Sequence, residues 1–124
     1  MKIFVVLGSL SALFGVAFGA FGAHGLKSRV TTEMLTVWQT GVFYHLVHAL
    51  ALVLIGILCQ LMPDTALVRC AGWTLLGGTV LFSGSLYVMV LSDIRALGII
   101  TPLGGVAFLV GWLLLAVAAW QQAA

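Results

Sequence analysis

The stretch WQTGVFYHLVHALALVLIGILCQLM, from Trp38 to Met62, decides the fold class of this chain. It contains 25 residues and no formal charge. An α-helix rises about 1.5 Å per residue, so a helix of this length crosses a hydrocarbon core of roughly 30 Å. Apolar and polar residues do not alternate along the stretch, as they would in a strand of a membrane barrel. The stretch therefore predicts a transmembrane helix.

One charge-free run of similar length precedes this stretch, and two more follow it. Only 6% of the residues are charged, whereas soluble domains carry about a quarter, so lipid must cover most of the surface. We predict an all-α protein, an integral membrane four-helix transmembrane bundle, in which residues 1–124 form a single four-span domain. The predicted spans are residues 3–23, 38–62, 70–92 and 98–120. The expected surroundings are the lipid bilayer, and a net charge of +2 without a basic stripe argues against nucleic acid.

The connections carry their own signals for where helices begin. Thr31 can cap a helix, and Glu33 would then lie in its positively polarised first turn, so we expect the second helix to begin near Thr32, before the membrane. Pro63 begins a tight turn between the second and third helices. Pro102 is expected about one turn into the fourth helix, where a missing N–H costs little; an earlier helix start would make it a kink.

Two features of the sequence leave alternatives open. The apolar run after Lys2 is longer than the apolar region of a signal peptide, so we expect a retained span, with cleavage as the alternative. Cys59 and Cys70 flank the same short loop. We expect two small buried residues there, and a disulfide bridge is the alternative.

The basic residues give a weak asymmetry between the two ends of the bundle. Four spans place both termini on one side, together with Lys2 and Arg69, and place the remaining three basic residues on the other. Those three residues are Lys27, Arg29 and Arg95. The excess of positive charge on cytoplasmic loops then predicts termini outside the cytoplasm.

Small residues form a smooth face on the first helix. Ser11, Gly15 and Gly19 repeat at a spacing of four, which lets another backbone approach closely. We expect this face to pack within the bundle, and dimerisation through the first helix is the alternative. The other candidate helix-packing residues are Gly84, Gly104 and Gly105.

Several polar side chains lie at membrane depth, where they are costly and often functional. Tyr44 and His48 are four residues apart and share a helix face, as do Ser83 and Tyr87. A cluster of these side chains could bind a small ligand or relay a proton, because histidine titrates near neutrality. The structural alternative is a set of hydrogen bonds between helices. The candidate cluster comprises His24, Tyr44, His48, Ser83 and Tyr87.

The sequence contains no recognisable catalytic or cofactor pattern. His45 and His48 form only a weak metal signal, since no cysteine or carboxylate stands at a useful spacing. No acidic residue lies inside any predicted span, and no phosphate loop, nucleophile elbow or zinc-protease motif occurs. We therefore predict no cofactor, no metal site and no enzymatic activity.

Four segments together resemble domain-of-unknown-function family 423, the small inner-membrane proteins of the UPF 0382 type and relatives of transmembrane protein 256. The segments are Phe21–Leu26, Thr40–Leu52, Phe82–Tyr87, and Thr101–Gly105 followed by Gly111-Trp112. The resemblance implies a multi-pass protein of the bacterial inner membrane and no assigned reaction. Members of the family often carry glutamine where this chain has His45, so the candidate cluster includes His48 and leaves out His45.

Two functions remain in view. The first is a non-catalytic membrane component that associates with itself or with a larger complex. The second is a binder or transporter of a small or lipid-like molecule that uses the intramembrane polar set. A histidine bonded to a neighbouring helix favours the first function, and a ligand-sized cavity beside His48 favours the second.

Overall fold

The computed structural model describes residues 2–123 and shows four long helices in that range. All four are long and apolar enough to cross a membrane, and these residues form no strand, so the predicted fold class is confirmed. The helices are α1 (Lys2–Phe21), α2 (Thr32–Leu61), α3 (Ala66–Ser92) and α4 (Thr101–Ala123). A π-helical turn, η1 (Gly22–Leu26), continues α1, and a short 3-10 helix, η2 (Arg95–Ile99), precedes α4.

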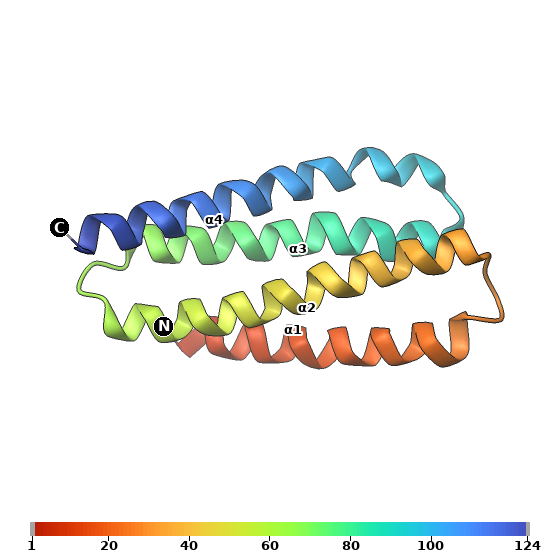
Figure 1. The fold of residues 1–124 in the computed structure, drawn as a ribbon, viewed down its shortest axis with the longest axis horizontal. Coiled ribbons are helices and arrows are strands. Elements are labelled where there is room, and N and C mark those ends of the chain that lie inside the picture. The colour runs from red at the N-terminus through yellow and green to blue at the C-terminus, as the bar shows by residue number, and fades with distance from the viewer. Residues whose placement is uncertain (1, 124) are drawn as a thin grey trace.

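The four helices run alternately up and down, in the order of the chain (Figure 1). Close backbone approaches join α1 to α2, α2 to α3, and α3 to α4. The central helices are therefore better covered by protein: 39% and 50% of the most apolar windows of α2 and α3 are buried, against 17% and 22% for α1 and α4. Much of the outer two helices is left for lipid or for another protein.

Local hydrogen bonds set the helix ends. The hydroxyl of Thr31 accepts a hydrogen bond from the amide of Met34 at 3.2 Å, and α2 begins at Thr32 as predicted. Asp64 accepts a bond from the amide of Ala66, the first residue of α3, in an Asx turn that leads into this helix. Pro102 is the second residue of α4, which is nearer the helix start than predicted. Its fixed φ and missing N–H suit this first turn, so the proline starts the helix and does not kink it.

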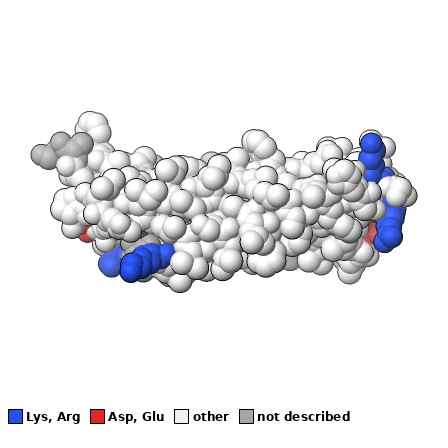
Figure 2. All heavy atoms as spheres, turned by 90° about the horizontal axis from the view of Figure 1, so that it is seen from below, with Lys and Arg blue, Asp and Glu red and all other residues white. Residues whose placement is uncertain are grey.

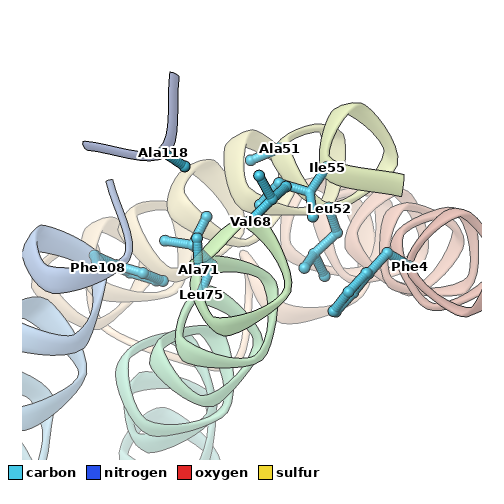
Figure 3. Close-up of a cluster of buried hydrophobic side chains, with 9 residues drawn as sticks. All are labelled: Phe4, Ala51, Leu52, Ile55, Val68, Ala71, Leu75, Phe108 and Ala118. Atoms are coloured by element: carbon cyan, nitrogen blue, oxygen red, sulfur yellow. The ribbon is translucent and has the colours of Figure 1, made fainter. Parts of the chain in front are cut away.

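Two apolar clusters hold the helices together. Figure 3 shows the first, in which Phe4 of α1 and Phe108 of α4 approach α2 and α3 from opposite sides. The second lies nearer the η1 end and is built around Trp38, Leu86 and Tyr87. Within a bilayer such contacts stabilise by close packing, since lipid tails are as apolar as the side chains.

Charged side chains gather at the two ends of the molecule and leave the middle without charge (Figure 2). At one end Arg95 of η2 lies 3.3 Å from the carboxylate of Glu33 at the start of α2. This distribution matches a protein whose middle lies in hydrocarbon. Cys59 and Cys70 are both free thiols, so the bridge considered from the sequence is not formed. The prediction that both are buried is wrong, because Cys59 is only partly buried and Cys70 is exposed.

Candidate functional site

His48 belongs to α2, and its side chain faces α4; the residue is only 3% exposed. Its Nδ1 donates to the carbonyl oxygen of Tyr44 at 2.7 Å, and its Nε2 accepts from the indole N–H of Trp112 at 3.0 Å. The imidazole also stacks on Phe108, with the ring centroids 3.6 Å apart. Because a carbonyl can only accept, the hydrogen must be on Nδ1, and both ring nitrogens are already engaged. His48 therefore acts as a link between helices.

His45 lies one turn earlier on α2 and contacts different helices. It is 7% exposed; its Nδ1 lies 2.8 Å from the hydroxyl of Tyr87 on α3, and its Nε2 lies 3.0 Å from the hydroxyl of Ser11 on α1. These bonds form a Ser11–His45–Tyr87 chain that crosses three helices. Polar groups linked in this way inside a membrane are candidates for function.

The five residues of the predicted cluster are not brought together. His48 and Tyr44 are neighbours, but Tyr87 is bonded to His45. Ser83 is 1% exposed and donates to the carbonyl oxygen of Gly41 at 2.7 Å, which ties α3 to α2. His24 is exposed in η1, at the end of the bundle.

The predicted cluster does not include His45, and Ser11 is predicted only as a helix-packing residue. The signal that could have identified this pair is the position of Ser11 on α1. Ser11 shares a helix face with Gly8 and Gly15, both of which are buried against α2. A hydroxyl on a helix face that packs within a membrane needs a partner on the opposing helix. His45 is that partner.

The small residues selected from the sequence fall into two groups. A Cβ added at Gly15 would lie 2.6 Å from Leu46, and one at Gly104 would lie 2.7 Å from the Cα of Phe82. Gly19 also faces α2, so the smooth side of α1 is occupied within the chain. By contrast, a Cβ at Gly84 or Gly105 would meet nothing within 4 Å. These two glycines therefore face away from the neighbouring helices.

The outward glycines line two grooves that each have a volume of about 450 Å³. We call the first the His45 groove; it lies between α1 and α3 and includes Ser11, His45, Gly84 and Tyr87. We call the second the Trp112 groove; it lies between α2 and α4 and includes Tyr44, His48, Gly105 and Trp112. The two buried histidines thus belong to different grooves.

A third hollow, of about 670 Å³, lies at the end of the bundle that carries η1 and η2. Its lining includes Arg29, Asp93 and Arg95, and Arg95 pairs with Glu33 and Asp93. Within residues 2–122, no three His, Cys, Asp or Glu side chains are grouped so that they could hold a metal ion.

Four apolar helices, charges confined to the ends and a polar chain at depth define a small multi-pass membrane protein. Residues 18–105 match the model of a family described as "Protein of unknown function (DUF423)". The chain belongs to this family.

Relatives of similar length support this assignment. The chain is 49% identical to the UPF0382 membrane protein YwdK of Bacillus subtilis, over 96% of this chain and 97% of the relative. It is 44% identical to the UPF0382 membrane protein SAB0533 of Staphylococcus aureus, over 99% of both chains. No solved structure matches the chain.

Proposed function

We propose that this protein is a non-catalytic component of the bacterial cytoplasmic membrane that associates with further copies of itself through the Trp112 groove. The observation that carries the proposal is the opening at Gly105, where a Cβ would meet nothing within 4 Å. A glycine on an outward helix face admits the backbone of another helix.

Tyr44 supports a protein partner at the same groove. Tyr44 is 38% exposed and lies six residues after Trp38, the first residue of the predicted second span. Among the hydrogen bonds of the described residues, none involves the Tyr44 hydroxyl. A neighbouring helix offers this hydroxyl acceptors that the hydrocarbon tails of lipids lack.

The engagement of His48 supports a role without catalysis. A general base needs a free lone pair, and the Nε2 lone pair of His48 accepts the indole N–H of Trp112. Of the two criteria drawn from the sequence, the bond from His48 to Trp112 on α4 favours the association hypothesis, whereas the groove of about 450 Å³ beside His48 is large enough for a ligand. Both ring nitrogens of His48 are already bonded, so His48 offers that ligand no free nitrogen.

The proposed orientation places both termini outside the cytoplasm. Lys27, Arg29 and Arg95 would then face the cytoplasm, as the positive-inside rule favours. A C-terminal alkaline phosphatase fusion, which is active only outside the cytoplasm, should be active. An active C-terminal green fluorescent protein fusion with an inactive phosphatase fusion would reverse this orientation.

Energy transfer between labelled copies in liposomes tests the association. Cys70 is exposed and is a convenient site for donor and acceptor dyes once Cys59 has been changed to serine. Transfer should persist at high dilution in lipid and fall when unlabelled protein is added. Gly105→Phe should raise the protein-to-lipid ratio for half-maximal transfer about tenfold or more, because a bulky side chain blocks the groove.

Gly77→Phe is the matched control. Gly77 is also exposed and has nothing within 4 Å of an added Cβ, but it does not line the Trp112 groove. If energy transfer between copies of the unmodified protein is no higher than random encounters in the membrane would give, the association is overturned. Equal loss in the Gly77 and Gly105 variants would overturn the assignment to this groove.

A further inference from the structure

The Ser11–His45–Tyr87 chain has more hydrogen-bond donors than it can use. A neutral imidazole carries one N–H, and each hydroxyl carries one O–H, so three hydrogens are available for two links. If Ser11 donates to His45, the Tyr87 hydrogen is left over. If the chain runs in the opposite direction, the Ser11 hydrogen is left over.

Within the described part of the chain, the surplus hydrogen has no other hydrogen-bond acceptor. Within residues 2–123, the hydroxyls of Ser11 and Tyr87 make no bond other than those to His45. Tyr87 is only 9% exposed, so water is largely kept from it. An unmatched donor in an apolar medium is costly, and the site therefore favours any molecule that brings an acceptor.

The space beside the chain is large enough for such a molecule. Ser11, His45 and Tyr87 all line the His45 groove, whose volume of about 450 Å³ lies in the range of ligand pockets. Most of the remaining lining is apolar, including Phe14, Phe18 and Leu76. Gly84 keeps the groove open because it has no side chain.

The groove is elongated along α3. Tyr87 lies five residues before the end of this helix at Ser92, or about 8 Å below the charged end. Leu76 lies eleven residues before Tyr87, about 16 Å deeper. The polar chain thus stands nearer the membrane surface, and the apolar part of the groove runs into the hydrocarbon.

We propose that the His45 groove binds a lipid-like molecule by its carbonyl oxygen. The carbonyl accepts the surplus hydrogen from Tyr87 or Ser11, and the apolar chain of the molecule lies along α3 toward Leu76. Two sources share this chemistry. One is the ester of a membrane glycerolipid, and the other is a free quinone with an isoprenoid tail.

The geometry favours binding without turnover, although a serine next to a histidine resembles a nucleophile and its base. The third member is the neutral phenol of Tyr87, which cannot stabilise an imidazolium as a carboxylate does. Ser11 also lies within α1, where backbone N–H groups are used by the helix and cannot stabilise an oxyanion.

Native mass spectrometry of the full chain in detergent tests the proposal. The first probe is a diacyl phosphatidylglycerol, compared with its dialkyl ether analogue, which lacks the carbonyl groups. The second is a short-chain isoprenyl naphthoquinone, compared with the same isoprenyl naphthalene without oxygen. One added hydrogen bond predicts that the carbonyl form of the bound probe is retained about three- to tenfold more strongly. This comparison needs no mutant.

Matched variants locate the binding site. Tyr87→Phe combined with Ser11→Ala should abolish the preference for carbonyl, whereas Ser9→Ala on the exposed side of α1 should keep it. Gly84→Phe should expel either probe by filling the groove, and Gly77→Phe, equally open but outside the groove, should not.

The outcomes separate the two sources and can overturn the proposal. Preference for the ester lipid alone supports a glycerolipid, and displacement of that lipid by the quinone supports a free quinone. Equal binding of the carbonyl and carbonyl-free forms in both pairs overturns the proposal. So does a carbonyl preference that survives both Gly84→Phe and the Tyr87/Ser11 double variant. Release of fatty acid from the ester lipid would overturn binding without turnover.

Discussion

Neighbouring glycines at the start of α4 should respond in opposite ways to the addition of a single methyl group. Gly104 faces α3, where an added Cβ would lie 2.7 Å from both Cα and Cβ of Phe82 and closer still to its amide nitrogen. Gly105 faces the Trp112 groove and has nothing within 4 Å. We predict that Gly104→Ala destabilises the bundle and that Gly105→Ala does not.

The magnitude follows from how far the helices must separate. Relieving the 2.7 Å approaches to an ordinary contact of 3.4 Å requires a shift of at least about 0.7 Å, and the closer amide nitrogen requires more. The atoms in the way are the backbone and Cβ of Phe82, which cannot rotate aside. A gap of this size forfeits roughly a quarter to a half of the attraction at each contact it opens. Overpacking of this kind costs about 1–3 kcal/mol, and we expect about 2 kcal/mol for Gly104→Ala. For Gly105→Ala we expect a change of no more than about 0.5 kcal/mol.

Reversible unfolding in mixed micelles, with increasing fractions of denaturing detergent, measures both free energies under the same conditions. Detergent is kept in enough excess that each micelle holds one chain, so association at Gly105 does not contribute. The unmodified chain and both variants should have the same helical content before the transition. Equal stability of the Gly104 variant and the unmodified chain would refute the close approach of α4 to Phe82. A loss of equal size in the Gly105 variant would refute the outward position of that glycine.

Three further predictions use the same unfolding assay. His48→Ala and Trp112→Phe should each lower stability. Because the indole N–H of Trp112 bonds to His48, their double-mutant cycle should give a coupling energy of about 0.5–1.5 kcal/mol. Additive effects of the two changes would contradict that bond. Trp38→Phe should cost about 0.6–1.7 kcal/mol through loss of the 2.8 Å bond to the carbonyl oxygen of Phe18, and an unchanged transition would argue against it. Arg95→Ala should change stability by less than about 1 kcal/mol, since the side chains of Arg95 and Glu33 are 59% and 70% exposed, and a larger loss that persists in high salt would show that the pair is shielded from water.

The fold class could be predicted from the sequence because the constraint is general. Charge-free runs as long as Trp38–Met62 have few alternatives to a membrane helix, and the capping signal at Thr31 placed the start of α2 correctly. The start of α4 was harder to predict, because the charge-free run after Arg95 continues through the short helix η2 into α4 and does not show where one helix ends and the next begins.

The arrangement of polar groups could not be predicted from spacing alone. Helical periodicity shows that Tyr44 and His48 share a face, but it does not say which helix lies opposite that face. The rotation of α2 against its neighbours turns His45 toward α1 and α3 and turns His48 toward α4. Rotation depends on packing along the whole helix, and the local sequence around a histidine does not contain that information.

The order of the helices in space has a consequence for biogenesis. Because close backbone approaches join each helix to the one made just before it, assembly can follow synthesis from the N-terminus onward. The α1–α2 hairpin can form before α3 enters the membrane, and α4 is added last, when Trp112 reaches His48. A chain divided in the turn at Pro63–Thr65 would yield two hairpins that need only the α2–α3 surface and a few bridging side chains to rejoin. The order of contacts is thus what insertion of the chain as two successive hairpins requires.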